Sequence, residues 1–222
     1  MTTDVFIPTL WRAQNLEPVL ASLEENTSDY LPLVICQAGD EPTISEARRL
    51  GVRFVVADQG NPATAVQKVN LGYRHSWAPF FFIGSDDIRF TPGWLDEAFK
   101  LMVDPISVVG INDDVPAHRH GGELPGHVLV RRSYIDEESG VADLPGTVLY
   151  EGYRHYYSDL EFWQTAMWRG RFASAFDSHI VHHHPNSGTA ETDETYKWSR
   201  SFMSADRQLY MQRRHVWEGI PA

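Results

Sequence analysis

Short apolar runs alternate with segments of helical periodicity in the first half of the chain. The runs lie at residues 5–7, 31–36, 52–57 and 79–84. Helices are expected between them, at 15–25, 44–50 and 63–73. This alternation predicts a parallel sheet with crossover helices. The runs LPLVIC and FFFIG are apolar throughout, as is typical of strands that are covered on both faces.

The second half of the chain is less regular. We expect strands at 106–111, 127–135 and 175–183, and helices at 159–168 and 193–217. A loop rich in Pro, Gly and His should cover 113–126. The sequence shows no internal repeat and no interdomain linker. It therefore predicts a single α/β domain with a mostly parallel central sheet, flanking helices and a C-terminal helical segment.

The net charge of the chain disfavours some classes of binding partner. The chain has 222 residues and a formal net charge of -11, with a sequence pI of about 5.3. Proteins that grip nucleic acid usually present a basic surface, so an acceptor in nucleic acid is disfavoured. A phosphorylated small ligand stays compatible with the acidity, because metal ions bridge carboxylates to phosphates.

Cysteine content and apolar run length indicate the compartment. Cys36 is the one cysteine, which fits a reducing environment. The N-terminus lacks the pattern of a signal peptide, and no apolar run approaches 18 residues. We therefore expect a cytoplasmic protein without a membrane span.

The most informative local feature is the apolar run FFFIG, which leads directly into Ser85, Asp86 and Asp87. Ligands of open parallel sheets gather beyond the carboxyl ends of the strands. Two adjacent carboxylates there are costly unless a partner neutralises them, and a divalent cation that holds a diphosphate is such a partner. A simple turn with a helix-capping Asp ahead of TPGWL would produce the same local pattern.

Several further motifs follow one another along the chain in a recognisable order. FIPTLWRAQNLEPVLASL is followed by QGNPATAVQKVNLGY, then SDDIRFTPGWL, GHVLVRRSYI and YYSDLEFWQTAMWRG, with histidines after the next strand. From residue 4 to about 196, this order resembles the GT-A nucleotide-sugar glycosyltransferases, especially the family 2 group. The resemblance implies a GT-A-like fold, with a nucleotide-sugar half at about 1–115 and an acceptor half at about 116–222.

The resemblance also implies a donor site. Asp87 matches the metal-ligating carboxylate, whereas Asp86 usually faces the donor ribose or a metal-bound water. Ser85 stands where many relatives have another Asp, which implies a weaker or more donor-dependent metal. Gln37, Asp40 or Glu41 would meet the nucleobase. The donor-binding residues implied are Pro8, Thr9, Gln37, Asp40, Asn61, Lys68, Ser85 and Asp86. Pro8 and Thr9 could instead simply end a strand, and Lys68 could lie on a solvated helix face.

Two further sites follow from the resemblance. Asp159 stands where inverting relatives place the base that deprotonates the acceptor, with Glu161 as its competitor. A helix cap at Ser158 or Asp159 would explain the same residues. The metal shell, for Mn²⁺ or Mg²⁺, would be completed by His184, or alternatively by His182. Packing or surface histidines are the other interpretation.

Together these features predict a metal-dependent glycosyltransferase of the hexosyl type. It would move a sugar from a nucleoside-diphosphate donor, expected to be a UDP-sugar, to an acceptor hydroxyl with inversion. A protein, glycan or small-molecule acceptor is left open. Glycines around His118, Arg119 and His120 suggest a lid, and Arg131 and Arg132 could pair with phosphates, with an acidic acceptor or in salt bridges. A nucleotidyltransferase and a non-catalytic carbohydrate-binding relative are the rival classes.

Overall fold

The structure is a computed structural model in which residues 1–115 and 126–219 are described. The predicted lid around His118, Arg119 and His120 lies outside these residues. The strands are β1 Thr3–Pro8, β2 Tyr30–Gln37, β3 Phe54–Ala57, β4 Phe80–Ile83, β5 Ile88–Phe90, β6 Val108–Asn112, β7 His127–Arg131 and β8 Phe172–His182. The helices are α1 Ala13–Asn26, α2 Glu41–Arg49, α3 Ala65–Arg74, α4 Trp94–Leu101, α6 Arg132–Glu137, α7 Ser158–Trp168, α8 Glu194–Arg200 and α9 Met203–Arg213, with 3-10 turns η1 Pro185–Ser187 and η2 Arg214–Val216.

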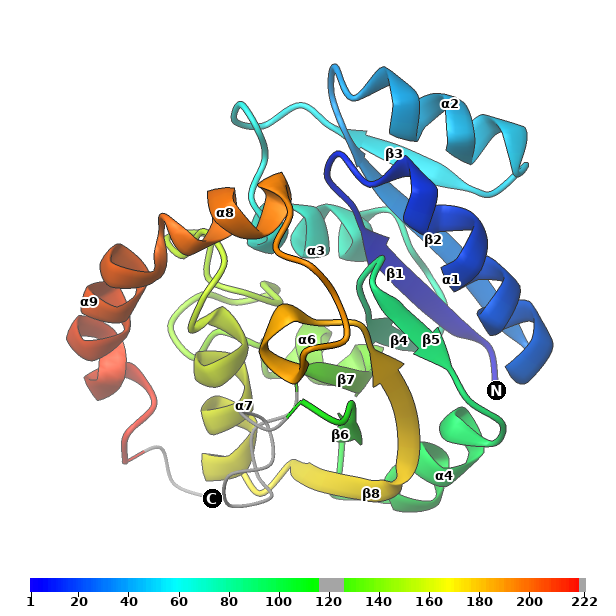
Figure 1. Ribbon diagram of the computed structural model, residues 1–222. Helices are drawn as coiled ribbons and strands as arrows, with labels where there is room; N and C mark the ends of the chain where they lie inside the picture. The colour runs from blue at the N-terminus through cyan, green and yellow to red at the C-terminus, as the bar shows by residue number, and fades with distance from the viewer. Residues whose placement is uncertain (116–125, 220–222) are drawn as a thin grey trace.

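Within the described residues, eight strands form one sheet in the order β3-β2-β1-β4-β7-β6-β8-β5. Strands β3, β2, β1 and β4 run parallel. Strand β7 runs antiparallel between β4 and β6, whereas β6 and β8 are parallel to each other. The long strand β8 bends across the molecule and ends beside β5 (Figure 1). The predicted α/β class and flanked central sheet are confirmed.

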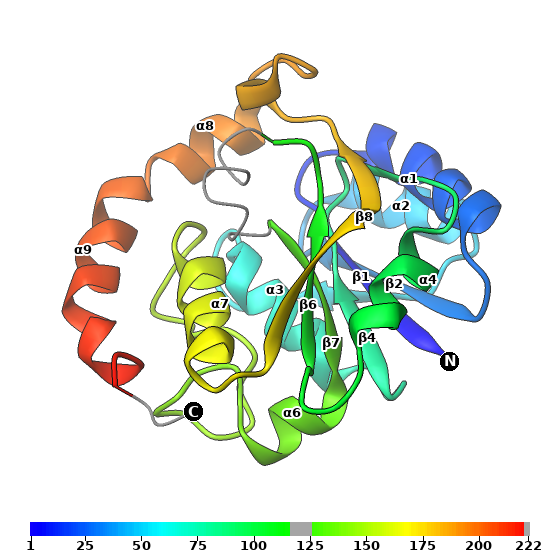
Figure 2. The ribbon, with the colours of Figure 1, turned by 90° about the horizontal axis from the view of Figure 1, so that it is seen from below.

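Helices cover both faces of the sheet. Figure 2 shows α1, α2 and α4 on one side, and α3 and α7 on the other, with α9 outside them. The strand β1 illustrates why the apolar runs are unbroken. Val5 and Ile7 pack into the cluster that α1, α2 and α4 contribute to, whereas Phe6 packs into the cluster that includes α3, α6 and α7. Alternate side chains of a buried strand enter opposite cores, so every position is apolar.

Two expectations about the elements need correction, and two elements were missed. The run at 127–135 is not one strand, because the backbone N–H of Arg132 donates to Pro79 O (2.9 Å) and its Nε donates to Ala78 O (2.7 Å), where α6 begins. The segment 193–217 divides into α8, α9 and η2. The short strand β5 and the helix α4 were not predicted.

Arg131 and Arg132 lie at the amino end of β4, where Arg131 is paired with Phe80. Nη2 of Arg131 donates to Met102 O at 3.0 Å. These arginines therefore lie at the amino end of β4, whereas Asp86 follows its carboxyl end. Their suggested role in phosphate binding is not supported.

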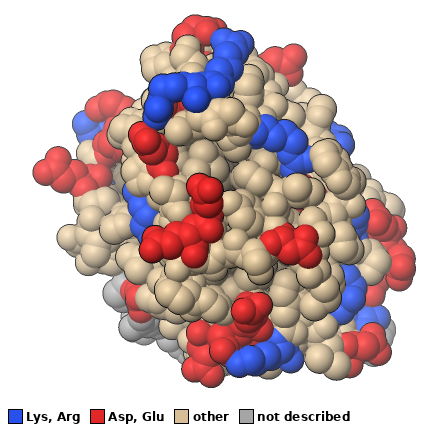
Figure 3. Space-filling view, turned by 90° about the vertical axis from the view of Figure 1, so that its right-hand side faces the viewer, with Lys and Arg blue, Asp and Glu red and all other residues tan. Residues whose placement is uncertain are grey.

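Surface charge and helix length add two observations. On the face shown in Figure 3, the Lys and Arg side chains of the described residues are dispersed among acidic and uncharged ones and form no continuous basic surface. Among the helices of the described residues, none is both long and apolar enough to cross a membrane.

Candidate functional site

The site forms where the loops that follow β1 and β4 meet. The two strands are neighbours in the sheet, and Gly84 N donates to Phe6 O at 3.1 Å. A Cβ at Gly84 would lie 2.9 Å from that carbonyl oxygen and 3.0 Å from the ring of Phe82. Glycine is therefore required for this close approach. It brings Thr9 and Arg12 next to Asp86 and Asp87.

Asp86 and Asp87 are both buried, and Arg12 lies between them. Its Nη1 is 3.1 Å from Asp86 Oδ1 and 3.0 Å from Asp87 Oδ2. The same guanidinium binds Asp193 through Nε (2.7 Å) and Nη2 (3.0 Å), and it stacks 4.2 Å from the ring centroid of Tyr196. Burial opposes the charge of Arg12, but the three carboxylates outweigh it and raise its pKa.

Asp87 carries further hydrogen bonds. Ser85 Oγ donates to Oδ1 (2.5 Å) and the Tyr196 hydroxyl donates to Oδ2 (2.6 Å), while His182 Nε2 lies 3.3 Å from Oδ1. Burial alone would raise its pKa, yet His182, Arg12 and Ser85 hold the pKa of Asp87 well below its usual range. For Asp86, burial and the charge of Asp87 raise the pKa against the opposing effect of Arg12. Asp87 is thus the firmly ionised member of the pair.

A second group of side chains continues from His182. Asp113 Oδ2 lies 3.3 Å from His182 Nδ1 and 3.2 Å from His127 Nδ1, and His127 Nε2 is 3.1 Å from Ser85 Oγ. Ligand atoms of Asp113, His127 and His182 all lie within 4.8 Å of one another. Burial lowers the pKa of His127, whereas Asp113 and Asp87 overcome burial and raise that of His182 to about 9.

Sequence reasoning missed Asp113 and His127. Asp113 follows β6, and His127 begins β7, which runs antiparallel to β6. The two residues therefore meet at one edge of the sheet, although they lie 14 positions apart in the sequence. Only the pairing of β6 with β7 could have revealed it.

The donor set suits a divalent cation. Carboxylate and imidazole ligands together fit Mn²⁺. The buried pair Asp86–Asp87 already has a positive partner, Arg12. A cation bound to Asp87 would compete with the hydrogen-bond donors of Asp87, which are Arg12, Ser85 and Tyr196.

The predicted donor residues surround the loop after β1. Lys68 is buried, and its Nζ donates to Thr9 O at 2.7 Å. Burial lowers the pKa of Lys68 to about 8, against the opposing charges of Asp86 and Asp40. Lys68 therefore does not lie on a solvated helix face. Thr9 is buried one residue after β1, which ends at Pro8.

Two predicted nucleobase contacts have structural partners. Asp40 caps α2 by accepting from Thr43 N, and it also accepts from Thr43 Oγ1 (2.8 Å) and Trp11 N (2.7 Å). Gln37 Oε1 accepts from Ala63 N at 2.7 Å. Both side chains therefore shape the loops at the ends of β1 and β3. Asn61 and Glu41 are exposed.

Asp159 lies in the first turn of α7, partly exposed. Tyr157 precedes this helix, and no side chain caps it, so the capping interpretation of Ser158 or Asp159 is not supported. His155 lies shortly before α7, and its backbone N–H donates to Asp206. Burial, the largest effect, lowers the pKa of His155, while the charges of Asp159, Asp206 and Asp87 act in the opposite direction. His155 was not singled out from the sequence.

Glu161 is held in a different environment. It is buried, accepts from the Tyr153 hydroxyl (2.8 Å) and is paired with Arg213 (2.8 Å). Tyr153 and Arg213 therefore occupy the carboxylate of Glu161 in the protein interior. Asp159 does not share these partners.

The two candidate histidines pack against each other but have different hydrogen-bond partners. His182 contacts Asp87 directly, whereas His184 Nδ1 accepts from Asn186 N (3.0 Å) at the start of η1. The ring of His184 packs against both His182 and Tyr196, with centroids 5.1 Å apart in each case.

Comparisons with known proteins agree with this architecture. The sequence matches no protein-family model, and no curated protein matches it. The structure resembles a mannosyltransferase from Pyrobaculum calidifontis in complex with GDP-Man and Mn²⁺ (TM-score 0.69, 14% identity, 95% of this chain and 64% of that chain). It also resembles glucosyl-3-phosphoglycerate synthase from Mycobacterium tuberculosis in complex with Mn²⁺, UDP-Glc and phosphoglyceric acid (TM-score 0.65, 13% identity, 93% and 79%).

A third similar structure is TarS from S. aureus in complex with UDP (TM-score 0.61, 14% identity, 81% of this chain and 59% of that chain). The chain thus spans less than two thirds of the mannosyltransferase and of the TarS structure. The parallel half-sheet, with carboxylates at the carboxyl end of β4, is typical of α/β proteins that bind ligands at a strand crossover. More narrowly, the fold is the GT-A fold of nucleotide-sugar glycosyltransferases.

Proposed function

We propose that this protein is a metal-dependent glycosyltransferase that transfers a hexose from a nucleoside-diphosphate sugar, UDP-linked in our hypothesis, to an acceptor hydroxyl. The observation that carries the proposal is the buried pair Asp86–Asp87 at the end of β4, with His182 3.3 Å from Asp87. Buried carboxylates and an imidazole at that point of a GT-A fold suit a cation that holds a diphosphate.

Asp87 and His182 would hold the cation, and Asp113 would orient His182 through Nδ1. The direct contact with Asp87 supports His182 over His184 as the imidazole ligand. When bound, a divalent cation supplies positive charge that stabilises a departing nucleoside diphosphate. The fold supports Mn²⁺, since two of the similar structures contain it, and Mg²⁺ is the alternative ion.

Asp159 is the proposed base. Its partly exposed carboxylate at the start of α7 is free of the buried ion pair that occupies Glu161. A carboxylate there would take the proton of the acceptor hydroxyl as that oxygen attacks the anomeric carbon, which inverts the configuration. The acceptor itself would be a protein, a glycan or a small molecule.

The experiment is a thermal-unfolding series with UDP, GDP, Mn²⁺ and Mg²⁺, singly and in pairs, followed by a donor-hydrolysis assay. We expect UDP to stabilise the protein only together with the cation, because ligand binding raises apparent stability. In Asp87→Ala, the cation-dependent part of the shift should vanish.

A matched control is Asp96→Ala, which removes an exposed carboxylate from the first turn of α4. It should keep the full response to UDP and Mn²⁺. An unchanged response in Asp87→Ala would refute the proposed cation site. UDP binding without donor hydrolysis or transfer would favour a non-catalytic relative.

A further inference from the structure

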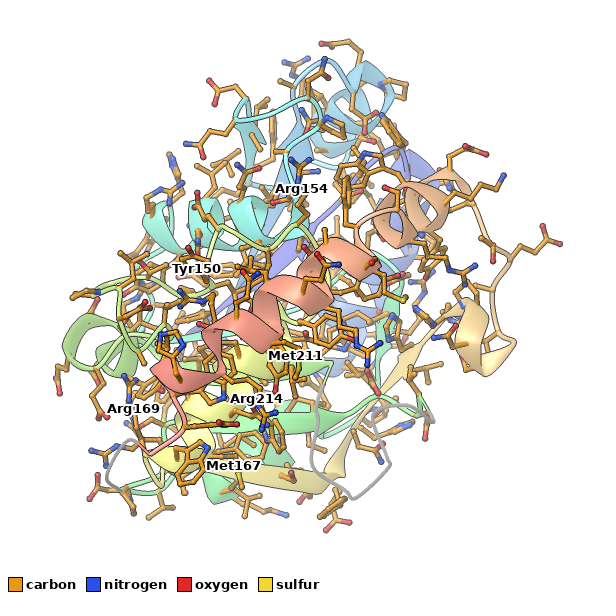
Figure 4. All side chains as sticks on the ribbon, turned by 90° about the vertical axis from the view of Figure 1, so that its left-hand side faces the viewer. Tyr150, Arg154, Met167, Arg169, Met211 and Arg214 are labelled. Carbon is orange, nitrogen blue, oxygen red and sulfur yellow. The ribbon has the colours of Figure 1, made fainter. Side chains whose placement is uncertain are left out.

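The helix α9 buries two charged side chains, together with a tyrosine, against the rest of the protein. Its buried residues are Asp206, Tyr210 and Arg213, spaced four and three residues apart and therefore on one helical face. Tyr150 and Arg154 lie beside α9 (Figure 4), where Arg213 packs on the ring of Tyr150 and Asp206 accepts from Arg154 N. Burial of such residues is favourable only when each polar group has a partner.

Asp206 has three partners from one short segment. Its Oδ1 accepts from Arg154 N (3.1 Å), and its Oδ2 accepts from both His155 N and Tyr156 N (2.9 Å each). The side chain is 2% exposed. Three consecutive backbone amides that converge on one carboxylate fix the path of this segment, and bonds to a charged acceptor are the stronger kind.

The next residue is also constrained. Tyr157 has a φ of 66°, a left-handed conformation that costs about 1–3 kcal/mol for a side chain of this kind. Its ring lies 5.2 Å from that of Tyr210, one turn after Asp206 on α9. The same face of α9 thus contacts the backbone amides of 154–156 through Asp206 and the ring of Tyr157 through Tyr210.

The segment leads into α7, which carries the proposed base. Burial lowers the pKa of His155, and the charges of Asp159, Asp206 and Asp87 act in the opposite direction. Asp159 follows Tyr157 by two residues, in the first turn of α7. A shift of the backbone at 154–157 would therefore move the proposed base relative to Asp86 and Asp87.

We propose that Asp206 is a positioning residue for sugar transfer. From α9 it sets the backbone that leads into α7 and presents Asp159 to the acceptor. This inference rests on the proposed function, but its structural part can be tested separately. Asp206→Asn keeps the side-chain volume and turns an NH₂ group toward amide donors, so some of the three bonds must be lost.

The first measurement is hydrogen exchange of the amides of Arg154, His155 and Tyr156. In the unaltered protein they should be protected, although they lie outside helices and strands. In Asp206→Asn their exchange should accelerate at least tenfold. Fast exchange in the unaltered protein would overturn the proposal even if the variant fails to fold.

The second measurement separates positioning from stability. Asp206→Asn should lower kcat for transfer roughly 10- to 100-fold, the scale of a small misplacement of a catalytic group, and leave the Kd of UDP with Mn²⁺ unchanged. The control is Asp143→Asn, which removes the partly exposed partner of Arg213 on the same helix face. It should leave both kcat and exchange at 154–156 unchanged.

Equal losses of kcat in the two variants, or an unchanged kcat in Asp206→Asn, would overturn the positioning role. If the unaltered protein transfers no sugar at all, the proposed function fails, while the exchange experiment still decides whether Asp206 holds the segment.

Discussion

Arg12 has the most unusual surroundings of any single residue in the site. Arg12 is 5% exposed, and its guanidinium contacts Asp86, Asp87 and Asp193, with Tyr196 stacked against it. Removing one partner from a buried charge group costs far more than the net value of the group, because the remaining charge stays buried. In this cluster the positive charge of Arg12 is balanced by carboxylates. A bound cation would share some of these carboxylates with Arg12.

Asp159 is the residue that distinguishes catalysis from binding. Asp159→Asn keeps the size of the side chain but cannot take a proton. We expect transfer to fall by roughly 10²–10⁴-fold, the range for loss of a general base. The Kd of UDP with Mn²⁺ should stay nearly the same, since Asp159 lies outside the Asp86–Asp87 cluster. Both quantities are measured on one purified variant.

The matched change is Glu161→Gln, which alters the neighbouring carboxylate of α7. It should destabilise the fold more than it slows transfer per folded molecule, because Glu161 is paired with Arg213. Activity of Asp159→Asn within a few-fold of the unaltered protein would remove it from the role of base.

His182 gives the site a defined pH dependence. Its pKa of about 9 lies above the usual value of 6.5, because Asp113 and Asp87 outweigh its burial. The stabilisation it contributes is fully present below about pH 6.5 and is lost as the pH rises toward 9. In a metal-free buffer with chelator, unfolding free energies of the unaltered protein and His182→Gln should converge over this window.

The convergence is at most about 1.4 kcal/mol per pH unit, which is the linkage slope for one proton. Chemical denaturation at pH 6.5, 7.5 and 8.5 measures it. A difference between the two proteins that stays constant with pH would show that His182 is not held as the cation by Asp87 and Asp113.

Among the elements, α9 and α7 are coupled by a buried ion pair. Arg213 binds Glu161 and Asp143, and lies 3.5 Å from the ring centroid of Tyr150. Arg213→Met should lower the unfolding free energy by about 3–5 kcal/mol, because Glu161 would be left buried without its partner. Adding Glu161→Gln to that variant should recover part of the loss.

The adjacent Arg214 supplies the control. It pairs with Glu218 four residues on, at the surface. Arg214→Met should cost less than about 0.5 kcal/mol, as is usual for such exposed pairs. Similar losses for the two arginines would mean that α9 is not tied to α7 through Arg213. Urea unfolding curves measure both.

At the scale of the whole molecule, the site draws on segments from both ends of the chain. Asp193 and Tyr196 from the C-terminal region contact Arg12 and Asp87, and Thr195 Oγ1 donates to Leu10 O (2.6 Å). The division into a donor half and an acceptor half at about residue 115 stays a prediction, and one sheet runs through both halves.

This convergence predicts the footprint of the ligands. UDP with Mn²⁺ should slow hydrogen exchange in the loop after β1 and in residues 84–87, and also at 193–196. The shallow pocket lined by Glu25, Thr27 and Asp96 serves as an internal reference and should show no change. Protection confined to that pocket would place the nucleotide elsewhere. Exchange measured by mass spectrometry with and without the ligands decides between the two.

The sequence by itself determined the parallel half of the sheet and the position of Asp86 and Asp87. Unbroken apolar runs such as FFFIG are long enough to specify buried strands, and the carboxylates follow directly in the chain. It also brought out Asp159, through the order of motifs. These features depend on neighbours in sequence, which a linear pattern records.

Tertiary structure alone decided how the rest of the site is assembled. Asp113 and His127 meet because β6 and β7 pair, and Arg12 finds Asp193 across 181 positions of sequence. Buried polar residues such as Asp206 carry no apolar periodicity, so α9 reads as a solvent-exposed helix until its partners are seen. Such contacts depend on which strands and helices become neighbours, and that follows from the packing of the whole chain and not from any local segment.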